Sequence, residues 1–438
     1  MLKDHFLLCC FLFVVLTACS PSKKVSSTEQ NFLQDTAIKN AHTGVCIYDA
    51  ASNRYIYNYQ GDHYFTPASN TKLFSCYAAL KYLSDSIIGL RYYETQDTLY
   101  LLPTGDPTLL YRDFSNNSVL NFLKANNKPV SISNAFWKEE YWGEGWSWDD
   151  YMGDYMAERS PMPVYGNIAK TEFTYDSITK ALHFSQTPDV TIGVSYRFNP
   201  KLKTPAVLRM INSDSFSIQY PAQNSSWSDY VPFVTNGLNA TVQLIGNKSW
   251  TVNNNAPAIS YSNYKKLYSQ FLDSMLKPMM YRSDNFYAEQ SLLMVSNELL
   301  GYMNDEAIID TLLKTAYKDL PQKPNWVDGS GLSRFNLFTP EDFITLLIKM
   351  KNEFGLQRVY NILPKGNTGT LEGLYLETGN SIFAKTGTLN GVVALSGYLN
   401  CKSGKLVLFS VLVNNHTGRA AAVRKAIEKM LTNVWEKY

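Results

Sequence analysis

Short apolar runs bounded by polar turns occur five times in the chain, twice near the N-terminus and three times near the C-terminus. Runs of this length and composition are typical of β-strands. The predicted strands are residues 43–49, 55–59, 382–386, 392–399 and 406–414. Polar turns at 50–54 and 400–404 join two of the neighbouring pairs. We therefore expect one sheet whose strands come from both ends of the chain.

Apolar residues at helical spacing predict helices between these strands. Thr66 is the expected N-cap of a helix that follows Pro67 and has the apolar stripe Leu73, Cys76, Tyr77 and Leu80. Further helices are predicted over 260–276, 286–300 and 340–353. A last helix carries Val423, Ile427, Met430, Leu431 and Val434 on one face. We expect that face to pack on the sheet, with a place on a membrane surface as the alternative.

The pattern changes between the first helix and residue 258. Short strand-like runs, such as 97–102 and 241–245, alternate here with turns rich in Asn, Asp, Ser and Gly. This favours a β-rich insertion over 92–257, which would divide a helix-and-sheet domain into segments 31–91 and 258–438. Trp142, Trp146 and Trp148 are expected in the core of the insertion.

Residues 1–19 have the pattern of an export signal. Lys3 precedes an apolar run, 6–15, that is too short to span a bilayer. The run ends in Leu-Thr-Ala-Cys19, which resembles a bacterial lipobox, and a polar tether, 20–30, follows. We expect an exported protein of the bacterial envelope that is lipid-anchored at Cys19 and faces the periplasm. An ordinary cleaved secretory signal is the alternative.

Composition narrows the possible chemistry. The formal net charge of +2 over 438 residues gives no basic surface of the kind that nucleic acid requires. The mature cysteines Cys46, Cys76 and Cys401 have no metal-ligand spacing, and buried free thiols are expected, with one disulfide as the alternative. The five histidines form no triad or metal pattern. No metal or other cofactor is expected.

Ser69 and Lys72 stand at i and i+3 where the first helix begins, and therefore on one helical face. A serine hydroxyl is a weak nucleophile until a base takes its proton. A lysine can be that base when desolvation or a second cation lowers its pKa. The motif alone is weak, because a solvated helix start has the same pattern.

Two more motifs follow in the chain. Ser283-Asp284-Asn285 lies between two predicted helices, where a hydroxyl can relay a proton and an amide can orient a substrate. A plain helix N-cap is the alternative for this segment. Lys385-Thr386-Gly387-Thr388 ends a predicted strand, where the lysine can bind a carboxylate and lower the pKa of Lys72. Gly387 would let a ligand approach the strand closely.

The three motifs in this order are the set found in penicillin-binding proteins and class A β-lactamases. With them, the chain resembles class C low-molecular-mass penicillin-binding proteins, the D-alanyl-D-alanine carboxypeptidase/endopeptidase family (peptidase S13). The similar segments are 67–72, 105–109, 283–285 with 288–289, 328–334, 369–371 and 385–389.

The resemblance implies an α/β (α+β) fold of the serine transpeptidase and β-lactamase type, with a five-stranded antiparallel sheet flanked by helices. It implies that Ser69 forms the acyl-enzyme, that Lys72 is the general base and that Ser283 relays the proton. Asn285, Lys385, Thr386, Gly387 and Thr388 would bind the substrate, and the N–H groups of Ser69 and Thr388 would form the oxyanion hole. The partners would be peptidoglycan stem peptides and, as covalent inhibitors, β-lactams.

Two other functions fit parts of this pattern. A β-lactamase or esterase on the same fold would share the three motifs, but the Glu-x-x-x-Asn segment that deacylates class A β-lactamases is missing between residues 286 and 385. A non-catalytic peptidoglycan-binding lipoprotein would have no physical need for two lysines near one serine.

Overall fold

Five strands from the two ends of the chain form one antiparallel sheet in the computed structural model, which describes residues 31–255 and 259–438. The strand order is β14 (Ile382–Leu389), β15 (Val392–Asn400), β16 (Leu406–Asn414), β1 (His42–Asp49) and β2 (Arg54–Tyr59). The expected five-stranded sheet is therefore confirmed. The export signal, the lipobox cysteine Cys19 and the tether lie outside the described residues.

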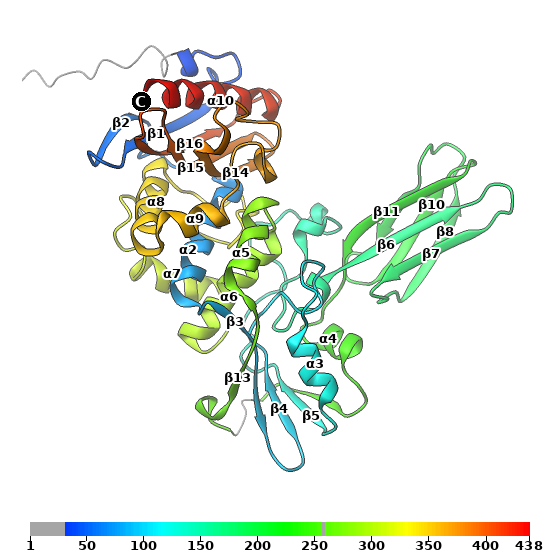
Figure 1. The fold of residues 1–438 in the computed structure, drawn as a ribbon. Coiled ribbons are helices and arrows are strands. Elements are labelled where there is room, and N and C mark those ends of the chain that lie inside the picture. Colours follow the sequence, from blue (N-terminus) through cyan, green and yellow to red (C-terminus); the bar gives the residue numbers. More distant parts are fainter. Residues whose placement is uncertain (1–30, 256–258) are drawn as a thin grey trace, which may run out of the picture.

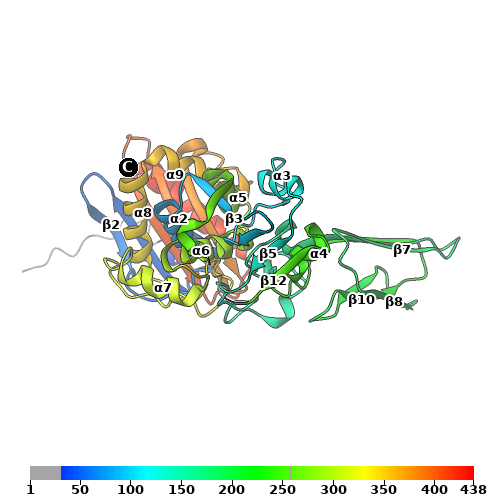
Figure 2. The same ribbon diagram turned by 90° about the horizontal axis from the view of Figure 1, so that it is seen from below.

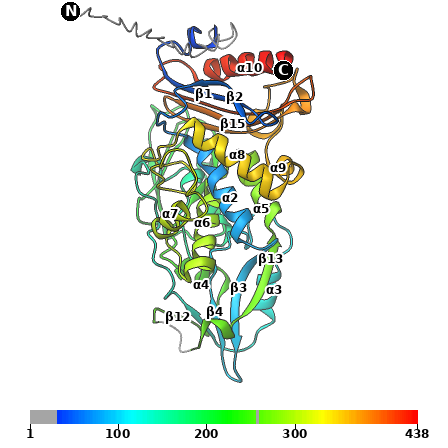
Figure 3. The same ribbon diagram turned by 90° about the vertical axis from the view of Figure 1, so that its left-hand side faces the viewer.

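Helices cover both faces of this sheet (Figures 1 and 3). Helix α10 (Ala420–Lys437) covers one face, and the residues that pack there include Val45 and Val411 of the sheet. Side chains that point to the opposite face of the sheet, such as those of Leu408 and Leu412, pack against the helices on that face. Those helices include α2 (Lys72–Tyr82) and α8 (Pro340–Phe354). The predicted fold class is confirmed, and α10 packs on the sheet as expected.

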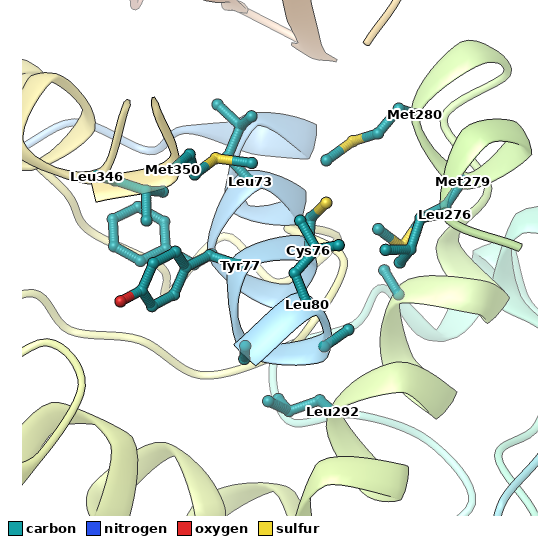
Figure 4. Close-up of a cluster of buried hydrophobic side chains, with 14 of the residues drawn as sticks. Leu73, Cys76, Tyr77, Leu80, Leu276, Met279, Met280, Leu292, Leu346 and Met350 are labelled. Carbon is teal, nitrogen blue, oxygen red and sulfur yellow. The ribbon is translucent and has the colours of Figure 1, made fainter. Parts of the chain in front are cut away.

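Helix α2 is the centre of the larger apolar core (Figure 4). Leu73, Cys76, Tyr77 and Leu80 all lie among apolar side chains of α5 (Leu272–Tyr281), α6 (Asn285–Leu300) and α8. Cys76 is therefore buried, and so are Cys46 and Cys401. All three are free thiols, which was expected, and the alternative of a disulfide is not found among them.

The start of α2 differs from the expectation. A 3-10 turn, η1 (Ala68–Thr71), precedes the helix, and no side chain caps it. Thr66 is instead held by Asn414, whose side chain accepts from the Thr66 N–H (2.8 Å) and donates to the Thr66 carbonyl (3.0 Å). The predicted Thr66 cap is therefore wrong, because a sheet residue takes the hydrogen bonds of this segment.

A second five-stranded sheet begins the insertion. It has the order β12 (Trp250–Asn253), β5 (Val130–Ser133), β4 (Leu99–Leu102), β3 (Ser86–Glu94) and β13 (Lys265–Phe271). Strands β3 and β13 pair with each other across the expected limits of the insertion, 92 and 257. The inserted sheet therefore extends beyond those limits on both sides.

Two three-stranded sheets form an outer lobe that projects from the molecule (Figures 1 and 2). One has the order β11-β6-β7 and the other β8-β10-β9. Their bounds are β6 (Ile168–Tyr175), β7 (Leu182–Thr187), β8 (Gly193–Phe198), β9 (Ala206–Arg209), β10 (Ser215–Tyr220) and β11 (Ser225–Pro232). Further helices in the described ranges are α3 (Ser118–Ala125), α4 (Asn239–Ile245), α7 (Asp305–Lys314) and α9 (Leu356–Ile362).

Three local predictions are wrong. Residues 260–276 were expected as one helix, but residues 265–271 form β13 and α5 begins only at Leu272. Residues 241–245 were expected as a strand and lie in α4. The tryptophans at 142, 146 and 148 do not form the core of the insertion. Trp148 is 69% exposed, and Trp146 donates to Asp328, which lies in segment 258–438.

The helices at 286–300 and 340–353 were predicted nearly to the residue. Over residues 31–255 and 259–438, we find no helix with the length and apolar character that a membrane span requires.

Candidate active site

Ser69 lies in the tight turn η1, between the sheet and helix α2. The preceding residue, Ala68, has φ +48°, a left-handed conformation that costs an L-residue roughly 1–2 kcal/mol. Two glycines let the chain pack closely around this turn. A Cβ on Gly331 would lie 1.9 Å from the Ala68 carbonyl oxygen, and a Cβ on Gly387 would lie 2.5 Å from that of Pro67. The turn is therefore held between two glycine-containing segments.

Lys72 lies one helical turn after Ser69 and has no exposed surface. Its Nζ donates to Ser69 Oγ (3.0 Å), to Asn285 Oδ1 (2.6 Å) and to the Ser330 carbonyl (2.7 Å). Burial lowers the pKa of Lys72 to about 8, although the carboxylates of Asp328, Glu289 and Asp284 act in the opposite direction. A lysine in this state can exchange a proton near neutral pH.

Ser283 and Lys385 form a second hydroxyl–amine pair. Lys385 Nζ donates to Ser283 Oγ (2.9 Å) and to the Thr386 carbonyl (2.7 Å). Ser283 has φ +62° and does not cap α6. That cap is Asp284, whose side chain accepts from the Tyr287 N–H. A helix N-cap, the alternative role for this motif, is therefore present, and Asp284 forms it. The cap does not use the Ser283 hydroxyl, which accepts from Lys385.

The two buried lysines lie close enough to affect each other. Burial, and then the charge of Lys72, lower the pKa of Lys385 well below its ordinary value. Burial is the main cause of the lowered pKa of Lys72. That Lys385 lowers the pKa of Lys72 stays a prediction.

Strand β14 brings the third motif to the same cleft. Ser69, Asn285 and Thr388 line a cleft of about 440 Å³ together with Asp150, Tyr155, Gly331, Leu332, Arg334, Leu389 and Asn390. Thr388 Oγ1 accepts from Arg424 Nη2 (2.7 Å). A Cβ on Gly387 would lie 3.1 Å from the Ser69 nitrogen, so the strand passes directly beside the turn that carries Ser69. The structure thus brings the sequence-predicted residues of the three motifs together.

Several residues around this cleft were not predicted. The Tyr155 carbonyl of the insertion accepts from Asn285 Nδ2 (2.9 Å). Asp328 accepts from the N–H groups of Gly331 (2.7 Å) and Ser333 (2.6 Å) and thereby shapes the loop that supplies the Ser330 carbonyl. In the sequence, the segment 328–334 shows only a family resemblance, and Tyr155 shows no signal of a role. In the ranges 31–255 and 259–438, no cluster of His, Cys, Asp or Glu is placed to hold a metal ion.

The fold and the paired serine–lysine groups define a serine enzyme of the penicillin-recognising class. The sequence model of the D-Ala-D-Ala carboxypeptidase 3 (S13) family matches residues 26–194 and 251–434, and the chain belongs to this family. The protein is accordingly a D-alanyl-D-alanine carboxypeptidase, and the resemblance found in the sequence is confirmed.

Individual relatives cover nearly the whole chain. A D-alanyl-D-alanine carboxypeptidase of an Actinomadura species is 27% identical over 90% of this chain and 82% of its own length. The carboxypeptidase DacB of Haemophilus influenzae is 25% identical over 91% of this chain and 92% of its own. The crystal structure of penicillin-binding protein 4 (dacB) from the same organism shares the fold, with a TM-score of 0.76 at 20% identity. That match covers 94% of this chain and all of the other.

Proposed function

We propose that the protein removes the terminal D-alanine from peptidoglycan stem peptides through an acyl-enzyme on Ser69. One observation carries this proposal above the others: the fully buried Lys72 amine lies 3.0 Å from Ser69 Oγ, and burial lowers its pKa to about 8. A general base must lie within hydrogen-bond reach of the proton that it takes and have a pKa near the working pH. Lys72 meets both conditions.

The first half of the reaction is acyl transfer to Ser69. In its amine form, Lys72 takes the Ser69 proton as Oγ attacks the carbonyl carbon of the scissile bond. The electron pair moves to the carbonyl oxygen, which the N–H groups of Ser69 and Thr388 stabilise. The C–N bond then breaks, and the departing D-alanine amine takes, through Ser283, the proton that Lys72 accepted from Ser69. Water later attacks the ester, gives one proton by way of Lys72 to Ser69 Oγ, and releases the shortened peptide as a carboxylic acid.

The residues of the other two motifs would hold the substrate. Lys385 lies buried beside Ser283, and an incoming carboxylate favours its ammonium form. Thr386, Gly387 and Thr388 form the strand edge along which the peptide would lie, and Asn285 would contact it from the opposite side of the cleft. In this proposal Lys385, Thr386 and Thr388 bind the terminal carboxylate of the substrate.

β-Lactams would acylate Ser69 in the same way, because their strained amide presents its carbonyl to the same groups. A structural neighbour, penicillin-binding protein 4 of H. influenzae, has been crystallised in complex with a β-lactam, and it shares this fold with a TM-score of 0.72. That likeness supports the proposal through the fold.

The proposal places the enzyme in the bacterial cell envelope. A signal peptide over 1–19 and a lipid on Cys19 would anchor it, and the tether 20–30 would separate it from the membrane, with the enzyme facing the periplasm. Segments 31–91 and 258–438 would form the catalytic domain, and 92–257 the inserted domain. The pairing of β3 with β13 favours moving these limits outward, to Ser86 and Phe271.

Digestion of purified wall peptides tests this function. Mass spectrometry before and after incubation should show stem peptides that have lost one D-alanine with the wild-type protein and no change with Ser69→Ala. Cleavage of cross-linked peptides, in addition or instead, would identify endopeptidase activity on the same acyl-enzyme. Unchanged peptides with the wild-type protein would contradict the proposal.

A further inference from the structure

A buried ion cluster lies near Lys72, and none of its residues is among those that line the substrate cleft. Glu289 of helix α6 is 1% exposed, and its Oε2 is 3.6 Å from Nη1 of Arg159, which belongs to the insertion. Arg159 is equally buried and also pairs with Glu139 (3.1 Å) and Asp305. The cluster therefore joins the insertion to the helix that begins at Asn285.

One residue connects this cluster with Lys72. The Ser330 N–H donates to Glu289 Oε1 (2.7 Å), and the Ser330 carbonyl accepts from Lys72 Nζ (2.7 Å). Asp328 fixes the neighbouring residues of the loop through the N–H groups of Gly331 and Ser333. The position of the Ser330 carbonyl, and with it that of the Lys72 amine, thus depends on a carboxylate at position 289.

A buried ion pair is a weak source of stability, because desolvation offsets most of the attraction between its charges. Apolar residues of similar volume often serve equally well in such a place. Glu289 nevertheless lies in a largely buried helix, with one oxygen accepting from the loop that holds Lys72 and the other facing Arg159. This arrangement favours a role in the site over a role in packing.

Building on the proposed role of Lys72 as the general base, we propose that Glu289 is a positioning residue for Lys72. Its carboxylate holds Ser330 so that the Ser330 carbonyl keeps the Lys72 amine within reach of Ser69. Arg159 lies opposite the Glu289 carboxyl group and favours its charged form, whereas burial and the charge of Asp328 favour its neutral form. The insertion thereby supports the catalytic base from outside the substrate cleft.

Glu289→Gln tests this role, with Glu139→Gln as the matched control. Glutamine has one acceptor oxygen for the two donors, so the Ser330 hydrogen bond and the contact with Arg159 compete. Glu139→Gln removes a carboxylate from the same arginine, but in the part of the chain that the structure describes Glu139 makes no hydrogen bond to Ser330. We expect penicillin acylation to slow ~10-fold or more in Glu289→Gln, on the scale of lost positioning. Glu139→Gln should remain within about twofold of wild type, because the hydrogen bond between Glu289 and Ser330 stays intact.

The pH profile of acylation separates positioning from simple loss of structure. The charged groups that face Lys72 are Glu289, Asp328 and Asp284, which raise its pKa, and Lys385, whose own pKa Lys72 lowers. Burial and the charge of Asp328 raise the pKa of Glu289 itself to about 8, against the opposing effect of Arg159. Glu289 therefore gains its charge over the same pH range in which Lys72 becomes an amine. Glu289→Gln removes that charge and should move the upper part of the acid limb to lower pH. A merely structural role would reduce the plateau in proportion to the folded fraction and leave the limb in place.

Glu289→Asp decides the matter if the glutamine variant does not fold. It keeps the charge beside Arg159 but draws the carboxylate back from Ser330, so acylation should slow while the melting temperature stays near that of wild type. Wild-type rates and pH limbs in the Glu289 variants, or equal losses in Glu289→Gln and Glu139→Gln, would overturn the inference. Failure of the wild-type protein to acylate would instead overturn the proposed function on which it rests.

Discussion

At the scale of single residues, the state of the Lys72 amine decides whether Ser69 can react. An amine held by three acceptors would ordinarily stay protonated, since hydrogen bonds to a cation favour the charged form. Complete burial acts against this, and its effect on the pKa of Lys72 exceeds that of the nearby carboxylates. The site therefore depends on a balance between desolvation and three acidic neighbours.

Lys72→Arg should separate basicity from charge. Arginine stays protonated at any working pH, so the variant keeps the cation but cannot accept the Ser69 proton. We expect a folded protein whose acylation by penicillin is slower by ~10²-fold or more, the usual scale of general-base catalysis. Lys81→Arg is the matched control, because Lys81 lies on the same helix and pairs with Glu353 at the surface. Near-normal acylation by Lys72→Arg would rule out Lys72 as the base.

Acylation by the wild-type enzyme should also depend on pH. The amine form of Lys72 increases as pH rises through its pKa of about 8, so the rate should increase and then level off above that value. At pH 6 only about 1% of Lys72 would carry the free amine, which predicts a rate roughly 100-fold below the plateau. The acylation rate, measured from reactions stopped at timed intervals at pH values between 6 and 9.5, gives this profile. A flat profile would show that Lys72 does not limit the reaction.

The residues of the three motifs could be predicted because their chemistry is local. Ser69 and Lys72 are one turn apart in the sequence itself, and the order of the motifs limits the possible folds. Tyr155 and Arg159 could not be predicted in this way. Their contacts with Asn285 and Glu289 join segments more than a hundred residues apart, and nothing in the sequence around them indicates a partner.

At the scale of elements, the turn η1 and the loop that contains Gly331 fit together only because Gly331 has no side chain. Gly331 has φ +81°, and its missing Cβ leaves room for the Ala68 carbonyl. The turn that carries Ser69 and the loop that holds Lys72 therefore form one unit. A change in the loop should affect the nucleophile as well as the base.

Gly331→Ala tests this coupling, and Gly301→Ala is its control. Both glycines have positive φ, but a Cβ on Gly301 would meet nothing within 4 Å. Gly301→Ala should lose only about 1 kcal/mol of unfolding free energy, the cost of placing a residue with a Cβ at positive φ. Gly331→Ala should lose clearly more and should also acylate more slowly, because the turn must shift. Equal stability losses and equal acylation rates in the two variants would show that the close approach is unimportant.

The elements that could be predicted are those whose pattern agrees with their packing. Strands β1 and β16 and helices α6 and α8 have continuous apolar runs or clear helical stripes, and their observed limits differ from the predicted ones by few residues. Residues 265–271 were wrongly predicted as helical because they form a strand only by pairing with β3, which lies far away in the sequence. Residues 241–245 were mistaken for a strand because a short apolar run fits both states.

At the scale of the whole molecule, residues 92–257, the proposed insertion, contact the segment that carries the second motif. Tyr111 donates to Asp284 (3.0 Å), Asp113 pairs with Arg282, and Arg159 reaches Glu289. These contacts hold both ends of the segment that carries Ser283 and Asn285. The insertion thus supports the second motif of the active site.

The proposed lipid anchor is a property of the whole molecule. Two or more acyl chains suffice for stable anchoring, and Cys19 is the residue that would carry them. Cys19→Ala should move the protein from the membrane fraction to a soluble or unprocessed form. Fractionation and mass spectrometry of the mature N-terminus measure this. If Cys19→Ala fractionates and matures like wild type, the protein is not a lipoprotein anchored at this residue.

The central claim, an acyl-enzyme on Ser69, is tested most directly by intact-protein mass spectrometry after exposure to penicillin, followed for hours. The opened ring of a penicillin stays tethered to its carbonyl and shields the ester, so rapid release needs a dedicated deacylating group. No glutamate lines the cleft beside Ser69 among the residues that the structure describes. We predict one persistent adduct on the wild-type protein and none on Ser69→Ala. No adduct on the wild-type protein, or rapid loss of the adduct with many turnovers of penicillin, would contradict this account.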